Sequence, residues 1–173
     1  MNPGQVTDDS ELAMCLLNAL NDGNGKLDLK LTCKWYAKWM NSEPFDVGGT
    51  TKNGLGGCNE QQPTPSEPIT RATKNAGATS LSNGSLMKIS PLAVWCQNLS
   101  VAELADAVNA DVSFMHSRWE VKHMCILYTI AIQSLIKNAN SADRFSKALQ
   151  AVNEYVQESK VIDRSIKDFL EIA

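Results

Sequence analysis

Two neighbouring carboxylates between two hydroxyl groups form the first candidate site, at Thr7-Asp8-Asp9-Ser10. Carboxylate and hydroxyl oxygens are hard ligands of the kind that Mg²⁺ prefers in proteins. The same residues also suit the start of a helix, where negative charge interacts favourably with the helix dipole. Taken alone, the tetrapeptide is therefore open to two interpretations, a divalent-metal site and an ordinary helix start.

Two glycine-containing segments are candidates for binding an anion or a sugar. Residues 44–51 end in two glycines and two threonines, and such a backbone can approach a phosphate closely. Residues 80–92 form a polar turn that runs into an apolar stretch. A turn that leads into a helix directs backbone N–H groups at an anion. Each segment alone also fits an ordinary surface loop or helix start.

The spacing of histidines and cysteines argues against a site built from these residues alone. His116 and His123 are seven residues apart, which on one helix separates them by about 10 Å, too far to share a metal ion. No two of the five cysteines are three positions apart, so we expect neither a disulfide framework nor a structural zinc site. Cys15 and Cys125 fall on apolar stripes typical of a core, and a reactive thiol at Cys58 is a less favoured alternative.

Apolar residues recur at three- and four-residue intervals along most of the chain, which is typical of amphipathic helices. Ser100 and Glu103 have the spacing of a helix capping box. Phe145 and Leu149 fall on an apolar stripe and are expected to face inward. We expect helices over residues 9–20, 29–40, 85–95, 100–109, 118–137, from 141 onward and over 161–173.

Residues 41–79 are rich in glycine and proline and poor in apolar side chains, which predicts a long loop of a kind that often carries function. No strand-like alternation appears elsewhere. The sequence therefore predicts an all-α fold and a single domain over residues 1–173, with that loop at about 41–79.

Composition excludes several classes of function. The net charge of −3 argues against nucleic-acid binding, which favours a strongly basic surface. No stretch reaches the ~18 apolar residues that span a bilayer, so we expect no membrane partner. The first residues lack the basic and apolar regions of a secretion signal, so we expect a cytoplasmic or other intracellular protein that is not secreted.

The order of these segments resembles that of the ADP-ribosylglycohydrolase family. Family members carry a T-D-D-T-like helix start, a P-F-D-I-G-x-T-T-like loop, an N-G-x-L-M-R-x-x-P-L-like segment and a T-H pair that opens a long helix. The matching segments here, in the same order, are Thr7-Asp8-Asp9-Ser10, residues 44–51, residues 83–92 and Met115-His116. The resemblance covers roughly residues 4 to 137, and four motifs in order make it specific.

The resemblance implies a compact orthogonal helix bundle with a dinuclear Mg²⁺ site, or Mn²⁺ in some members. It implies hydrolysis of the glycosidic bond between ADP-ribose and a modified protein side chain, because paired cations position ribose and water oxygens. By matching position, the metal ligands are Thr7, Asp8 and Asp9. The residues near ADP-ribose are Gly48, Gly49, Thr50, Ser80, Leu81, Ser82, Asn83 and His116.

The same comparison implies that the domain is incomplete. Family members begin with a further helix and an acidic flap, and they end with a G-G-D-T-D-T-like segment that supplies the remaining metal ligands. We therefore expect weak metal binding, an isolated chain without catalytic activity, and a second protein chain that covers the missing ends. The alternatives are an inactive scaffolding subunit of a larger assembly and a module that binds ADP-ribose without cleaving it.

Overall fold

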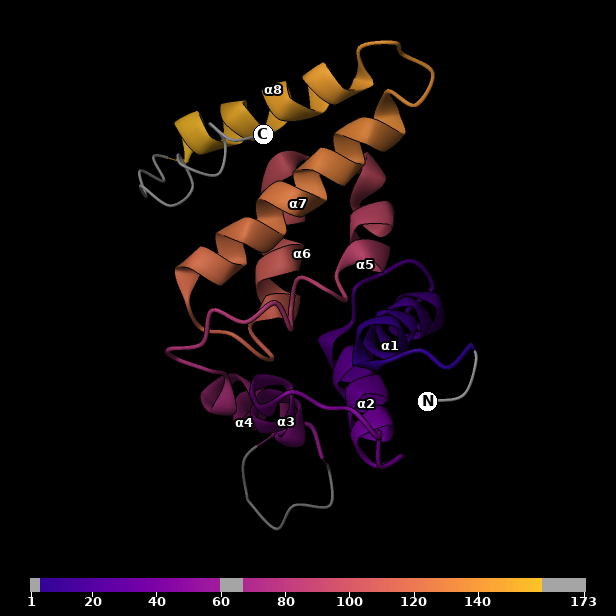
Figure 1. The fold of residues 1–173 in the computed structure, drawn as a ribbon, viewed down its shortest axis with the longest axis vertical. Coiled ribbons are helices and arrows are strands. Elements are labelled where there is room, and N and C mark those ends of the chain that lie inside the picture. The colour runs from indigo at the N-terminus through magenta and orange to yellow at the C-terminus, as the bar shows by residue number, and fades with distance from the viewer. Residues whose placement is uncertain (1–3, 60–66, 160–173) are drawn as a thin grey trace.

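The computed structural model describes residues 4–59 and 67–159, and it confirms the expected all-α fold (Figure 1). Within these residues there are eight α-helices and one 3₁₀ helix, and the β-type pairing is limited to an isolated bridge between Gly77 and His116. None of the described helices is long and apolar enough to cross a membrane. The helix expected over 161–173 lies outside the described residues.

The first two helices follow the sequence prediction closely. Helix α1 covers Asp8–Asp22 and α2 covers Leu29–Met40. The Asp28 carboxylate accepts hydrogen bonds from the first N–H groups of α2, at 2.8 Å from Lys30 and 3.3 Å from Leu31. This side-chain cap satisfies donors that have no partner within the helix, and it fixes where α2 begins.

The segment 41–79, expected to be one long loop, instead contains two short helices. These are α3 (Gly49–Gly56) and α4 (Pro68–Asn75), which pack against each other. A β-carbon at Gly54 would lie 2.4 Å from the Phe114 carbonyl oxygen, so only glycine lets α3 approach that backbone. Tertiary contact therefore stabilises a helix whose composition alone predicts a loop.

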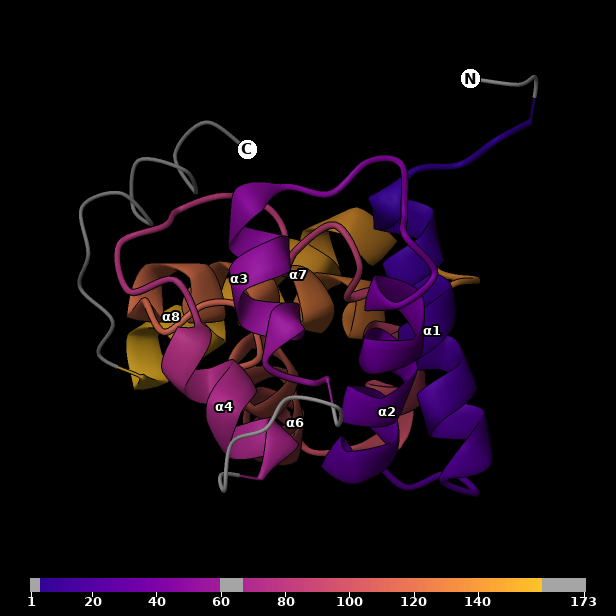
Figure 2. The same ribbon diagram turned by 90° about the horizontal axis from the view of Figure 1, so that it is seen from below.

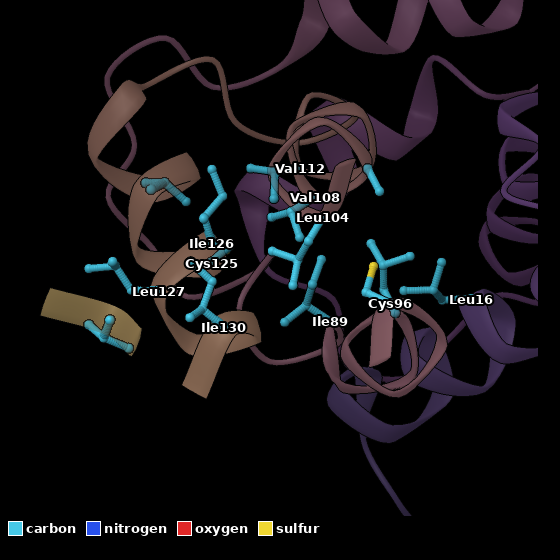
Figure 3. Close-up of a cluster of buried hydrophobic side chains, with 14 of the residues drawn as sticks. Leu16, Ile89, Cys96, Leu104, Val108, Val112, Cys125, Ile126, Leu127 and Ile130 are labelled. Atoms are coloured by element: carbon cyan, nitrogen blue, oxygen red, sulfur yellow. The ribbon is translucent and has the colours of Figure 1, made fainter. Parts of the chain in front are cut away.

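The larger hydrophobic core, shown in Figure 3, is formed by α1 together with the second half of the described chain. Side chains of α1, α5 (Ser90–Trp95), η1 (Cys96–Asn98), α6 (Val101–Val112), α7 (Trp119–Lys137) and α8 (Arg144–Glu158) contribute to it. The predicted capping box is present, with Ser100 and Glu103 each bonding the backbone of the other. The predicted helix over 118–137 is confirmed to within one residue.

A second, smaller core lies among α1, α2, α3 and α4, and α1 contributes residues to both cores.

A buried polar cluster connects the segment after the 80–84 turn to α2 and α6. The Lys88 ammonium donates to Asp111 and, at 2.7 Å, to the Tyr36 hydroxyl, which itself donates to Asp111 at 2.6 Å. Lys88 and Asp111 are fully buried, so each charge depends on the other for compensation.

The inward placement expected for Phe145 and Leu149 is wrong. Their side chains are 67% and 40% exposed, and they line an apolar groove of about 610 Å³ between α7 and α8. The helical stripe is real, but within the described residues no further element covers that face of α8. Periodicity identifies an apolar face and does not say whether it is covered.

All five cysteines are buried and form no disulfide with one another, which confirms the core placement expected for Cys15 and Cys125. Burial raises the pKa of Cys15 to about 11 and the pKa values of Cys96 and Cys125 to about 12. A hydrogen bond with Cys33, and then burial, raises the pKa of Cys58 still further. Cys58 therefore stays a protonated thiol, and the structure gives no support to a reactive cysteine there.

Candidate functional site

Three of the segments singled out in the sequence meet at one hollow of about 120 Å³. Figure 2 shows the N-terminal ends of α1 and α3 directed to the same side of the molecule. The 82–84 turn closes the third side. The residues that line this hollow, called here the polar hollow, are Asp8, Gly48, Gly49, Thr50, Thr51, Ser82, Asn83, Gly84 and Met87.

The start of α1 brings the carboxylates to this hollow. Thr7 is the N-cap residue of α1, but its hydroxyl makes no capping bond and instead donates to Asp9 at 3.1 Å. Partial burial, and then the negative charges of Asp9 and Asp46, raise the pKa of Asp8 above its usual range. The described residues hold no cluster of three or more His, Cys, Asp or Glu side chains arranged for a metal ion.

The start of α3 leaves open space where the two glycines lie. Gly48 is the N-cap residue in an extended conformation, and Gly49 is the first helical residue. A β-carbon at Gly49 would meet no protein atom within 4 Å, and one at Gly48 would meet only the Thr51 hydroxyl at 3.9 Å. Packing within the described residues therefore does not require glycine at these two positions.

A chain of hydrogen-bonded hydroxyl groups runs from α3 into the interior. The Thr50 and Ser80 hydroxyls lie 2.8 Å apart, and Ser80 donates to the Ser82 hydroxyl at 3.1 Å. The Ser82 hydroxyl lies 3.1 Å from Nε2 of His116, whose Nδ1 lies 2.7 Å from the Ser85 hydroxyl. The chain joins α3, the 80–85 turn and the segment before α7.

His116 lies beneath this turn, and its side chain does not line the polar hollow. The residue is fully buried, and its backbone belongs to the bridge in which Gly77 donates to the Met115 carbonyl at 2.8 Å. Burial, and then the positive charge of Lys88, lower the pKa of His116. The imidazole is therefore neutral near pH 7.

Leu81 points away from the polar hollow, with a side chain that is 63% exposed. It lines a neighbouring hollow of about 260 Å³, called here the apolar hollow, together with Ser82, Asn83, Leu86, Glu120, Val121 and Met124. Ser82 and Asn83 line both hollows. The two spaces therefore adjoin along the 82–83 turn.

The structure brings together most of the residues that the sequence singled out. Asp8, the 48–50 segment and Ser82-Asn83 line the polar hollow, while Ser80 supports it through Thr50. Asp46 and Ser85 are functional candidates that sequence reasoning missed. Both lie inside segments already recognised as unusual, at 44–51 and 80–92, so their position in those motifs was the available signal.

Comparison with known proteins shows the family to which the sequence is similar. The family model described as ADP-ribosylglycohydrolase matches residues 1–173. A putative ADP-ribosyl glycohydrolase of Acanthamoeba polyphaga mimivirus is 30% identical over 156 residues, which cover 86% of this chain and 45% of that protein. The ADP-ribosylarginine hydrolase Tri1 of Pseudomonas putida is 23% identical over 189 residues, covering 98% of this chain and 48% of that protein.

An uncharacterized protein of Escherichia coli, YegU, is 25% identical over 181 residues, covering 99% of this chain and 50% of that protein. The chain thus spans about half the length of these curated relatives. The family match extends over the whole chain, and the four motifs recognised in the sequence are spread along it. The chain belongs to the ADP-ribosylglycohydrolase family.

Proposed function

We propose that this chain supplies the ADP-ribose-binding part of a hydrolase that cleaves the glycosidic bond between ADP-ribose and a modified protein side chain. The observation that carries the proposal is the polar hollow, where the starts of two helices and a glycine-containing turn converge. The family membership supports the reaction class, and the polar hollow supports binding of the substrate's anionic part.

The start of α3 supports binding of a phosphate group. Backbone N–H groups in the first turn of a helix lack partners within the helix, and the helix dipole favours negative charge there. Because Gly48 and Gly49 carry no side chains, a ligand oxygen can approach that backbone closely. The hollow is small, at about 120 Å³, which suits a compact group such as a phosphate.

The remainder of the ligand has a place in the apolar hollow. Its volume is about 260 Å³, and Leu86, Val121 and Met124 give it an apolar wall. A purine ring is flat and largely apolar, so burial against such a wall is favourable. In this arrangement the diphosphate of ADP-ribose lies across Ser82 and Asn83, which both hollows share.

A divalent cation, Mg²⁺ or Mn²⁺, fits the oxygen donors at the start of α1. Burial, and then the negative charges of Asp9 and Asp46, raise the pKa of Asp8, and a bound cation would relieve the repulsion among these carboxylates. Thr7, Asp8 and Asp9 would hold the ion, with water completing its coordination. When bound, such cations polarise and orient ribose and water oxygens. A site with so few carboxylates binds one ion weakly.

Calorimetric titration of the chain tests the proposal. ADP-ribose, inorganic pyrophosphate and adenosine are titrated separately, each with and without Mg²⁺. We expect ADP-ribose to bind most tightly and pyrophosphate to compete with it, because the polar hollow recognises the phosphates. Absence of ADP-ribose binding at millimolar concentration, or equal binding of adenosine and ADP-ribose, would contradict the proposal.

Identifying the modified residue that the chain recognises requires a substrate in which ADP-ribose is attached to a peptide. The Pseudomonas putida relative is named an ADP-ribosylarginine hydrolase, so a peptide carrying ADP-ribosylarginine is the first substrate to test. The same peptide carrying ADP-ribosylserine is the matched comparison. Because the isolated chain is expected to bind without cleaving, the readout is affinity: tighter binding of the arginine peptide would assign arginine as the modified residue, and tighter binding of the serine peptide would exclude it.

A further inference from the structure

The buried end of the hydroxyl chain fixes the direction of its hydrogen bonds. Ser85 and His116 are both fully buried, and the Ser85 hydroxyl lies 2.7 Å from Nδ1 of the ring. Within the part of the chain that the structure describes, Nδ1 is the only hydrogen-bond partner of that hydroxyl. The Ser85 hydrogen therefore has one acceptor available, the ring nitrogen.

This arrangement selects one tautomer of His116. If Ser85 donates to Nδ1, the neutral ring carries its hydrogen on Nε2. In the opposite tautomer Nδ1–H would donate to Ser85, and the Ser85 hydrogen would be buried without an acceptor. An unsatisfied buried donor disfavours that arrangement by about a factor of ten. Burial and the charge of Lys88 lower the pKa of His116, which keeps the ring in the neutral form to which this argument applies.

The tautomer of His116 in turn determines whether the Ser82 hydroxyl accepts a hydrogen bond from the ring or donates one to it. The Ser82 oxygen accepts from the Ser80 hydroxyl at 3.1 Å, and it also accepts from Nε2–H of His116 at 3.1 Å. A hydroxyl oxygen has two acceptor sites, so both are filled and its own hydrogen must point elsewhere. Ser82 is exposed and lines both the polar and the apolar hollow. Its hydrogen is therefore available to a ligand.

We propose that His116 is a positioning residue: Ser85 holds it as the Nε2–H tautomer, and it makes the Ser82 hydroxyl a hydrogen-bond donor toward the ligand. A donor at this point favours a group that only accepts, such as a phosphate oxygen, over a group that must donate. This indirect role differs from the position next to ADP-ribose that the sequence resemblance implies for His116. The assignment of phosphate as the ligand group rests on the proposed function, whereas the tautomer does not.

Nitrogen NMR of the unliganded chain tests the tautomer directly. Long-range ¹H–¹⁵N correlations distinguish a protonated from an unprotonated ring nitrogen, and the chain has two histidines. The variant His123→Gln assigns the two sets of signals. We expect an unprotonated Nδ1 and a protonated Nε2 for His116 at pH 7.5. A protonated Nδ1, or a ring protonated on both nitrogens, would overturn the inference without any ligand being present.

Binding measurements test the consequence for Ser82. We expect Ser82→Ala to weaken ADP-ribose binding about tenfold or more, because a hydrogen bond to a charged group is lost. Ser146→Ala, on α8 where it lines the apolar groove and neither of the two hollows, is the matched control and should bind like the wild type. Unchanged affinity in Ser82→Ala would overturn the donor role. If the wild type does not bind ADP-ribose, the proposed function fails while the tautomer result still decides the inference.

The variant Ser85→Ala removes the hydroxyl that donates to Nδ1 of His116. A mixture of the two neutral His116 tautomers should then replace the single Nε2–H form. A buried serine-to-alanine change keeps the backbone and loses only the hydroxyl. Retention of a pure Nε2–H form in this variant would show that Ser85 does not select the tautomer. The measurement on the unliganded wild type, assigned with His123→Gln, does not depend on Ser85→Ala and remains decisive whatever the stability of that variant.

Discussion

Gly49→Ala separates a ligand-binding role of the α3 glycines from a structural one. A β-carbon at Gly49 meets no protein atom within 4 Å, and Gly49 lines the polar hollow. The new methyl group takes up roughly the 30 Å³ of a water molecule. In a hollow of about 120 Å³ this removes a substantial part of the space. It also keeps a ligand oxygen away from the first N–H groups of α3.

The expected effects on stability and on binding have opposite signs. Alanine in place of a helical glycine stabilises a protein by roughly 0.5–1 kcal/mol. For a chain of 173 residues this raises the melting temperature by about 1–4 °C. Losing hydrogen bonds to a charged ligand costs about 1.5–3 kcal/mol, which weakens ADP-ribose binding about 10- to 100-fold.

Gly56→Ala is the matched control, because it lies at the other end of α3. Its β-carbon also meets no protein atom within 4 Å, and it does not line the polar hollow. The two variants are compared by thermal unfolding and by titration with ADP-ribose. Both should be at least as stable as the wild type, and only Gly49→Ala should bind weakly. Wild-type affinity in Gly49→Ala would refute the reasoning.

The remaining predictions concern the metal, the buried ion pair and pH. Millimolar Mg²⁺ should raise the melting temperature, since a ligand of the folded state stabilises it, and Asp8→Asn with Asp9→Asn should abolish the increase; an equal increase in the double variant would exclude these carboxylates as ligands. Lys88→Met should lower the free energy of unfolding in denaturant by about 3–5 kcal/mol, because Asp111 keeps an uncompensated buried charge. A decrease of less than about 1 kcal/mol in the free energy of unfolding would contradict this reasoning. Burial lowers the pKa of His116 and of the second histidine, so the folded state binds fewer protons than the unfolded state. Their contribution to stability is complete above the unfolded pKa of about 6.5 and is lost as the pH falls below it, so the melting temperature should drop between about pH 7 and 5.5. A melting temperature that stays constant over that pH range would argue against lowered pKa values for the two histidines.

Sequence periodicity predicted the helices that bury a continuous apolar stripe. The bounds of α2 match the prediction residue for residue, and α7 differs by one residue. Helix α3 was missed because it holds three glycines and buries only three of its residues. Its stability depends on contact between Gly54 and the Phe114–Met115 backbone, some 60 residues away in the chain, which no local pattern reveals.

The sequence motifs predicted which segments meet at the polar hollow, but they did not predict how each side chain is placed there. The motifs identified which segments meet, and Asp8, Gly49 and Ser82 do line one hollow. The motifs did not show that His116 is buried behind Ser82, because that placement depends on a hydrogen-bond chain between residues more than 30 positions apart. Residue types suggest chemistry, whereas burial decides which atoms a ligand can reach.

Mapping of ADP-ribose binding by amide chemical shifts tests the central claim most directly. A chain of 18.9 kDa suits ¹H–¹⁵N correlation spectra, and the structure offers two competing places for a nucleotide. The account predicts that the largest shifts on titration fall at Gly48, Gly49 and the 82–84 turn, around the polar hollow. Shifts concentrated on the larger apolar groove between α7 and α8, or no shifts at millimolar ADP-ribose, would contradict it.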